Sequence, residues 1–365
     1  MRSTLLTRVR PALRDVSVFG GRACPPADAH QLFAEAIDRI RRLDFDCPPN
    51  EPTPRGYYGR LLDEPSPAQR EEVSRRIRYV LDVCSFGDCD PRGAAILEAG
   101  SGFGVGLVLL ACLGAQKACG VEIVPWMVEH ARRAAAQLPA PLAERVKPVV
   151  GTVVALPFAD GQFDAVLSLE AISHYLDYRP FIAEAHRVLR PGGVLVVSDG
   201  NNGLNPWIRR STLELWASHE LDVPSAPPDK PWLFVAKRQE IAREAVSGLS
   251  DAEAHAIALR TAGFVRAEVV EAARRYVEEG VLPDSPYRRG RLSVHPDHEM
   301  VMERLFDPFT LANEIESFGF EARLRGHWAG ASGRRSHRLA DRVLGLLTPI
   351  TIFTARGFRI AAVKR

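Results

Sequence analysis

Residues 94–104 have the sequence AAILEAGSGFG, the strongest structural signal in the chain. Its first six residues form a mostly apolar run, which is typical of a parallel strand buried on both faces. Gly100, Gly102 and Gly104 follow at once, and an apolar helical pattern over residues 104–113 comes next. A strand that ends in glycines and passes directly into a helix predicts a turn that approaches a ligand closely, with free N–H groups at the helix start.

The alternation of strand and helix continues beyond this stretch. We expect strands over residues 118–123, 145–150, 163–167 and 193–197, and helices over 126–138 and 179–189. After residue 305 it resumes with helices over 309–318 and 337–347 and strands over 320–326 and 358–364. This spacing predicts an α/β fold with a doubly wound, mostly parallel sheet. Because proline removes a donor from the hydrogen-bond ladder, Pro148 predicts that the third strand lies at an edge.

Composition and charge exclude several classes of protein. The chain has 365 residues with 47 basic and 45 acidic side chains, a net charge of +2 that argues against a dedicated nucleic-acid binder. No apolar run reaches the roughly 18 residues that a membrane-spanning helix needs. Six cysteines lie between residues 24 and 119 at spacings that match no zinc or redox motif. We expect Cys112 and Cys119 to be small buried hydrophobes, and free thiols favour a reducing, cytoplasmic location.

A second signal is Glu122, at the end of the strand that follows the glycine-rich stretch. It comes 18 residues after Gly104 (122 − 104), where a carboxylate can accept hydrogen bonds from both hydroxyls of a ribose. The alternative is an ordinary surface glutamate at a strand end. A dinucleotide-binding loop would carry a third glycine at the position of Val105, so the pattern argues against a nicotinamide dehydrogenase.

At this point residues 96–200 resemble the core of the class I S-adenosylmethionine-dependent methyltransferases, of the small-molecule type. The matching elements are the E-x-G-x-G-x-G loop at 98–104, Glu122, the segments 156–158 and 163–166, and the turn at 188–193. The resemblance implies a Rossmann-like methyltransferase sheet with an antiparallel last strand, and S-adenosyl-L-methionine as cofactor. Residues 305–365 are similar to that family's last helix and terminal strand pair.

The resemblance also implies roles for individual residues. Glu98 would help to fix the cofactor's ammonium group, and Glu122 would hold the ribose. Many relatives carry an aspartate after the glycine that ends the third strand, where this chain has Gly151 followed by Thr152, so adenine recognition is expected to rest on backbone groups there. Ile123 would pack on the adenine. The other positions assigned to the cofactor are Gly100, Gly102, Gly104, Thr152, Val153 and Leu169.

Three segments follow from this reading. Residues 1–90 are an N-terminal helical segment or lid, expected to be irregular before residue 66 except for a helix over 28–43. Residues 91–200 and 305–365 are the cofactor-binding core. Residues 201–304 are an insertion with helices near 208–220, 232–247, 251–262 and 266–279, expected to form a helical cap on the acceptor side.

The acceptor side offers one candidate catalytic residue, His174, in the segment after the fourth strand. It would act as a general base; the alternative is a histidine that only shapes the loop. Tyr57 and Tyr58 would close over the cofactor or pack in the core. The arginines at 209–210 and 288–291 suggest an anionic acceptor, or an ordinary solvated surface. Pro296 separates His295 from His298, which argues against a helical pair of metal ligands, so no metal is expected.

We therefore expect an enzyme that moves a methyl group to a small-molecule or lipid-linked acceptor. A protein or RNA methyltransferase is the first alternative, and it predicts a basic or peptide-binding rim. A cofactor-binding protein without catalytic activity is the second. The intact loop at 98–104 together with Glu122 argues against loss of cofactor binding.

Overall fold

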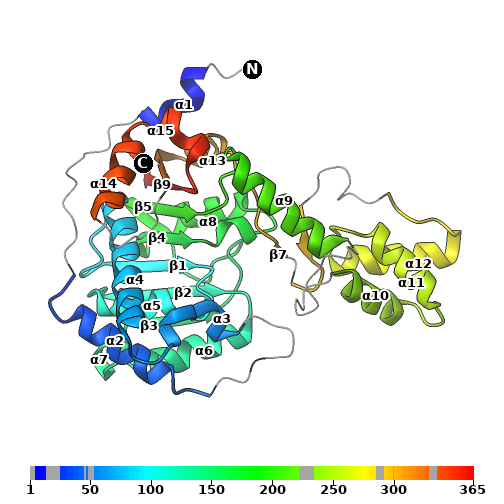
Figure 1. Cartoon of the computed structure of the whole chain (residues 1–365), viewed down its shortest axis with the longest axis horizontal. Helices are drawn as coiled ribbons and strands as arrows, with labels where there is room; N and C mark the ends of the chain where they lie inside the picture. The colour runs from blue at the N-terminus through cyan, green and yellow to red at the C-terminus, as the bar shows by residue number, and fades with distance from the viewer. Residues whose placement is uncertain are drawn as a thin grey trace. The chain divides into compact units, whose positions relative to one another are not determined.

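A computed structural model describes residues 5–13, 25–44, 47, 53–221, 234–284, 292–298, 300–328 and 335–365 (Figure 1). The chain divides into two units, each with its own internal contacts. The first unit comprises Met1–Ile172, Asp177–Asn205 and Asp307–Arg365, and the second comprises Ser173–Leu176 and Pro206–Phe306. No helix in the described part of the chain is both long and apolar enough to cross a membrane.

The first unit is built on a seven-stranded sheet in the order β3-β2-β1-β4-β5-β9-β8. The first five strands in this order are parallel, and β9 runs antiparallel to both of its neighbours, as the sequence predicts. The strands are β1 (Ala95–Ala99), β2 (Lys117–Glu122), β3 (Val146–Val150), β4 (Phe163–Leu169), β5 (Leu189–Asp199), β8 (Phe320–His327) and β9 (Gly357–Lys364). The edge position of β3, which contains Pro148, is confirmed.

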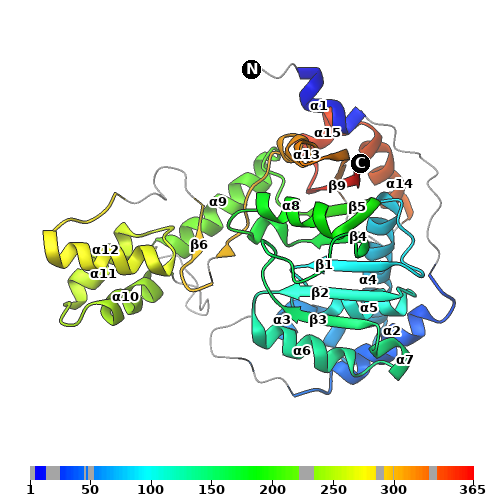
Figure 2. The same cartoon turned by 180° about the vertical axis from the view of Figure 1, so that it is seen from behind.

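Helices cover both faces of this sheet, with α4 and α8 on opposite sides (Figures 1 and 2). Right-handed crossovers on either side of the β1–β4 boundary require this arrangement. The α-helices of this unit are α1 (Leu5–Leu13), α2 (Ala29–Ile40), α3 (Pro54–Tyr58), α4 (Pro67–Phe86), α5 (Val105–Cys112), α6 (Pro125–Ala135), α7 (Ala140–Ala143), α8 (Arg179–Val188), α13 (Pro308–Ser317), α14 (Arg335–Leu346) and α15 (Thr348–Thr351); the short 3₁₀ turns are η1 (Gly59–Leu62), η2 (Ile172–His174, mostly in the second unit) and η4 (Ile352–Thr354).

Local chemistry explains several of these boundaries. The Ser66 hydroxyl caps α4 by accepting a hydrogen bond from the backbone N–H of Gln69, and Pro67 follows at the first helical position. Helix α5 is apolar all round because it is buried among α2, α4 and β2. Cys112 and Cys119 are each 2% exposed, so the expectation of small buried hydrophobes is confirmed.

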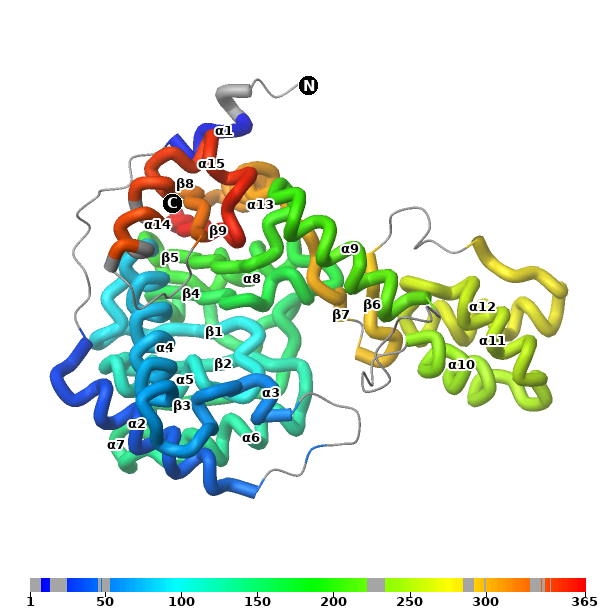
Figure 3. The backbone as a smooth tube through the Cα atoms, in the orientation of Figure 1, coloured from blue at the N-terminus to red at the C-terminus, as the bar shows by residue number. Residues whose placement is uncertain are grey.

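The expectation of an irregular N-terminal region with a single helix before residue 66 is wrong. Helix α1 lies beside α13 and α15 from the other end of the chain (Figure 3), where Arg8 forms an ion pair with Asp307. Helix α3 is capped by Thr53, whose hydroxyl accepts a hydrogen bond from the Gly56 N–H. These helices are too short to be stable alone and depend on tertiary contacts, which a local pattern does not reveal.

The second unit contains the expected helices and a small hairpin that the sequence did not predict. Its elements are α9 (Pro206–Glu220), α10 (Phe234–Ala245), α11 (Asp251–Arg260), α12 (Arg266–Glu279), β6 (Val294–His295) and β7 (Met300–Val301). A fully buried ion pair at 2.6 Å joins Arg238 on α10 to Glu220 on α9. Glu220 also accepts hydrogen bonds from the backbone of Gly263 and Val294, so one carboxylate ties together segments distant in sequence.

Candidate active site

The glycine-rich loop joins β1 to α5 and bends over the end of β2. The N–H groups of Gly100 and Ser101 both donate to the carbonyl of Val121, at 2.9 and 3.1 Å. Gly100, Gly102 and Gly104 have φ angles of 73°, 50° and 77°, a left-handed backbone that other residues adopt only with strain. The three glycines are therefore required by the path of the chain, and they bring the backbone close to whatever lies above the strand ends.

Glu122 ends β2 directly beneath this loop. Its carboxylate accepts the N–H of Gly102 at 3.0 Å through one oxygen and the N–H of Val124 at 3.1 Å through the other. Two backbone donors hold the carboxylate at the strand tip. The sequence placed a carboxylate beside the loop at this position, and the structure brings the two together.

Glu98, near the end of β1, is 7% exposed, and its Oε2 has no hydrogen-bond partner among the described residues. The carboxylate lies against the first turn of α5, where a Cβ added to Gly106 would be 2.2 Å from Oε2. Burial, followed by the negative charge of Glu122, raises the pKa of Glu98 to about 8. A buried carboxylate with one unpartnered oxygen, near a second negative charge, is costly unless a cation joins it.

Two tyrosines of α3 lie over the loop. The Tyr58 hydroxyl donates to the Phe103 carbonyl at 2.8 Å, and this ring is 1% exposed, so it packs in the core. Tyr57 is 47% exposed, packs edge-on against Phe103 at 5.3 Å, and places its hydroxyl where a Cβ on Gly102 would lie 2.8 Å away. Desolvation of the hydroxyl, with the charges of Glu98 and Glu122, raises the Tyr57 pKa.

The residues assigned to the adenine lie at the next strand ends. Ile123 follows Glu122 and is 56% exposed, which leaves its side chain available to a flat ring. The Gly151 N–H donates to the carbonyl of Glu122 at 3.0 Å, so the segment that begins with Thr152 and Val153 starts beside the tip of β2. The Thr152 hydroxyl accepts from the Val154 N–H at 3.4 Å. The adenine roles of Ile123, Thr152 and Val153 stay predictions.

Comparison with known proteins gives the family of this segment. Residues 97–197 match the sequence profile described as "Methyltransferase domain". This segment is a methyltransferase domain. The resemblance seen in the loop at 98–104 is thereby confirmed. The strand order reverses between the parallel strands β1 and β4, and ligands of doubly wound sheets lie beside such a switch point.

Relatives with curated names are similar over part of their length. The 2-methyl-6-phytyl-1,4-hydroquinone methyltransferase of Synechocystis sp. is 33% identical over 44% of this chain and 51% of its own. A probable tocopherol O-methyltransferase of Oryza sativa subsp. japonica is 31% identical over 36% of this chain and 37% of its own. The chain thus spans about half or less of these relatives. A solved geranyl diphosphate methyltransferase, with 15% identity and a TM-score of 0.43, aligns over 91% of this chain and 99% of its own.

On the other side of the switch, the methyltransferase domain carries a residue that the sequence analysis missed. Glu170 follows Leu169 at the end of β4 and has a φ of 51°. Its carboxylate accepts the Gly200 N–H at 2.8 Å and lies 3.3 Å from the Tyr79 hydroxyl. No local pattern signals a left-handed glutamate, because the conformation is imposed by segments that precede and follow it by tens of residues. Leu169 itself is half-buried, and its cofactor role stays a prediction.

His174, the candidate base, lies in the second unit. Its Nδ1 is 2.9 Å from the carbonyl of Val301 and its Nε2 is 3.8 Å from Oε1 of Glu303. A neutral ring therefore donates through Nδ1 and presents Nε2 as an acceptor, which is the tautomer that a general base needs. Its catalytic role stays a prediction.

The arginines proposed for an anionic acceptor give little support. Arg210 forms an ion pair at 2.8 Å with Glu214 on the same helix. The arginines at 288–291 lie outside the described residues.

In the part of the chain that the structure describes, no three His, Cys, Asp or Glu side chains converge as metal ligands. His295 accepts the N–H groups of Asp297 and His298 through Nδ1, which occupies that ring nitrogen.

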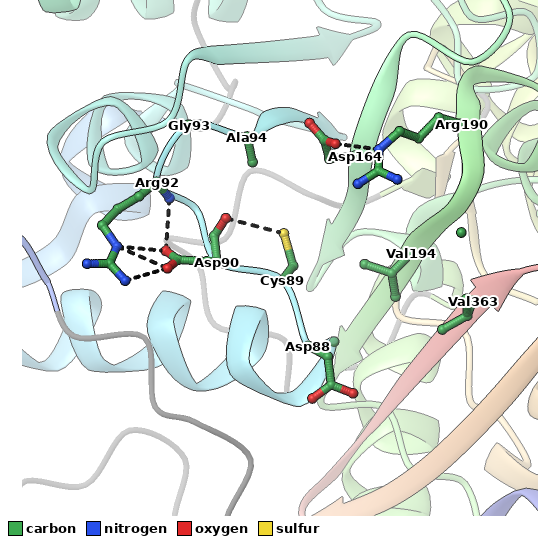
Figure 4. A pocket seen from close by; sticks show the side chains of 12 residues that line it. Asp88, Cys89, Asp90, Arg92, Gly93, Ala94, Asp164, Arg190, Val194 and Val363 are labelled. Atoms are coloured by element: carbon green, nitrogen blue, oxygen red, sulfur yellow. Dashed lines mark hydrogen bonds and ion pairs between the residues drawn. The ribbon is translucent and has the colours of Figure 1, made fainter.

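A cavity of about 350 Å³ lies at the amino ends of β1, β4 and β5, opposite the strand ends that carry Glu98 and Glu122 (Figure 4). Asp164 accepts a hydrogen bond from Arg190, and Asp90 from Arg92, within this cavity. Catalysis in doubly wound sheets takes place at the carboxyl ends of the strands, so this cavity is remote from the methyltransferase site. Its acidic and basic groups largely neutralise one another.

Proposed function

We propose that this chain is an S-adenosylmethionine-dependent methyltransferase that acts on a small-molecule or lipid-linked acceptor. The single observation that carries the proposal is the pair formed by Glu98 and Glu122 at adjacent strand ends. One carboxylate is buried with an oxygen that lacks a partner, and the other is held against the glycine loop. Such a pair favours a ligand with a positively charged end and a ribose.

The residues present suit this cofactor. When bound, the cofactor supplies a methyl group already activated on a positively charged sulfur. Glu98 would hold the ammonium group, and this positive charge would offset the cost of ionising the buried Glu98 carboxyl. Glu122 would accept the ribose hydroxyls while it keeps its bonds to the loop. Tyr57, above Gly102, would shield this end of the cofactor from water.

The acceptor class is supported by the curated relatives. Their names specify a 2-methyl-6-phytyl-1,4-hydroquinone and a tocopherol, both of them small molecules. The near-neutral net charge of +2 favours such a molecule over a nucleic acid. We propose His174 as an acceptor-side residue. A reducing compartment such as the cytoplasm suits the five free cysteines among the described residues.

Two measurements test this function. Titration calorimetry with S-adenosylhomocysteine should show binding, and Glu122→Ala should weaken it by about 1–3 kcal/mol because a charge-assisted pair is lost. Glu129→Ala, an exposed carboxylate on α6, is the matched control and should bind as the wild type does. Unchanged affinity in Glu122→Ala would reject the ribose role.

The acceptor is tested by transfer of a radiolabelled methyl group from the cofactor into cell extract. The extract is then separated into small molecules, lipid, protein and RNA. Label in the small-molecule or lipid fraction supports the proposal. Label confined to protein or RNA would reject the acceptor class, and binding without any transfer would indicate a catalytically silent module.

A further inference from the structure

Glu170 is held in a conformation that its side chain does not favour. Among the described residues, only Asp88, Glu170 and Glu303 combine a side chain larger than hydrogen with a left-handed backbone. Strain of this kind persists where the surrounding structure imposes it, and it gathers at functional sites. Glycine would relieve the strain at no steric cost. A glutamate at this point of the chain therefore calls for a function of its carboxylate.

Glu170 lies at the end of the sheet where the acceptor is expected to bind. In the pairing of β1 with β4, Glu98 lies opposite Leu167, so Glu170 is three residues beyond this pair at the carboxyl end of β4. The strand order reverses between β1 and β4, and ligands of such sheets lie in the crevice outside these strand ends. With Glu98 and Glu122 assigned to the cofactor on the β1 and β2 side, the β4 side is left for the second substrate.

The carboxylate is oriented from two directions. Oε2 accepts the N–H of Gly200, the first residue after β5, and Oε1 faces the hydroxyl of Tyr79 on α4. Tyr79 is itself positioned by Ser198, 3.1 Å away on β5. These two contacts orient the carboxylate at the end of β4.

Glu170 also lies near the proposed cofactor groups. The Tyr57 hydroxyl, whose pKa is raised first by desolvation, is affected by the charges of Glu98, Glu122 and Glu170, with Arg76 acting in the opposite sense. The charges of carboxylates from the ends of β1, β2 and β4 thus all act on one hydroxyl of α3. All of these residues belong to the first unit.

We propose that Glu170 is a catalytic residue that binds a hydroxyl of the acceptor and takes its proton during methyl transfer. This inference rests on the proposed function and specifies a hydroxyl-bearing acceptor. The acceptor oxygen forms a bond to the methyl carbon, the carbon–sulfur bond breaks, and its electron pair remains on sulfur. The acceptor proton passes to the Glu170 carboxylate and then to water. His174 would then contribute to acceptor binding and not to proton transfer.

The test compares Glu170→Gln and His174→Ala in full-length protein, with the extract fraction that wild-type protein labels as acceptor. Gln keeps an oxygen for the Gly200 N–H but cannot take a proton. We expect Glu170→Gln to bind S-adenosylhomocysteine as the wild type does, to lose at least about 100-fold in turnover, and to lose the acid limb of the pH–rate profile. His174→Ala should retain that limb. Turnover within threefold of wild type in Glu170→Gln, or loss of the limb in His174→Ala alone, would overturn the proposal.

A second comparison separates function from structure without an acceptor. Asp88 is also a left-handed acidic residue, hydrogen-bonded to Arg323 at the opposite edge of the sheet, so Asp88→Gly is a matched control for Glu170→Gly. Both glycine variants should melt close to wild type and bind S-adenosylhomocysteine, while only Glu170→Gly loses transfer. A much lower melting temperature or lost cofactor binding in Glu170→Gly alone would assign the carboxylate a structural role. Failure of wild-type protein to bind S-adenosylhomocysteine would instead refute the proposed function.

Discussion

Replacement of Glu98 by glutamine should stabilise the protein relative to the wild type, and this difference should grow as the pH rises. Glu98 is 7% exposed, and burial together with the charge of Glu122 raises its pKa from the ordinary 4.5 to about 8. Between these two values the unfolded chain has lost the proton and the folded chain keeps it. The folded state therefore binds more protons, and the free energy of unfolding falls with increasing pH. Glutamine carries no titrating proton and lacks this dependence.

The size of the effect follows from the same two values. One retained proton lowers the free energy of unfolding of the wild type by about 1.4 kcal/mol for each pH unit between 4.5 and about 8. The free energy of unfolding of Glu98→Gln minus that of the wild type should therefore be larger at neutral pH than in acid, by about 3 kcal/mol. This is an upper bound, since relaxation and water entry at the carboxylate reduce the cost of its ionisation.

The assay is urea denaturation of wild-type and variant protein at a series of pH values from acid to slightly alkaline. All other titrating groups are common to both proteins, so the difference between the two curves isolates Glu98. Glu129→Gln, an exposed carboxylate, serves as the control and should follow the wild type throughout. A difference between Glu98→Gln and wild type that does not change with pH would refute the burial argument and with it the need for a cationic ligand.

Three further predictions follow from particular contacts. Gly106→Ala places a Cβ 2.2 Å from the Glu98 carboxylate and should weaken S-adenosylhomocysteine binding at least tenfold by calorimetry, about 1.4 kcal/mol; equal affinity would contradict the close approach. His174→Ala should lower turnover in steady-state kinetics with cofactor affinity nearly intact, and unchanged turnover would remove it from the acceptor side. Arg238→Met leaves Glu220 buried without its partner and should cost about 3–5 kcal/mol in denaturation of the second unit, with Arg238→Met/Glu220→Leu recovering most of the loss.

Elements with strong local patterns were predicted well. The strand at 94–99 and the helix at 104–113 correspond to β1 and α5 within a residue at each end. The position of Pro148 at the sheet edge followed from the missing donor alone. Signals of this kind depend on neighbours in the sequence, so they survive without knowledge of the tertiary structure.

Elements that depend on distant partners were missed. Helix α1 packs beside α13, nearly 300 residues away in the chain, and the β6–β7 hairpin pairs only two residues on each strand. Glu170 gave no signal because its left-handed backbone and its bonds to Tyr79 and Gly200 arise from the assembled sheet. Gly106 was read as part of a helical pattern, although its lack of a side chain makes room for Glu98.

Local properties of the chain were enough to predict a doubly wound sheet, a glycine loop after its first strand and a carboxylate after its second, because strand periodicity and glycine's backbone freedom depend on neighbouring residues. The assembled fold was needed to find that Glu98 is buried with one unpartnered oxygen, that Tyr57 lies above the loop, and that Glu170 is oriented at the end of β4. Desolvation and the charge of a neighbour act through space, so the chemistry of a carboxylate depends on which distant segments surround it.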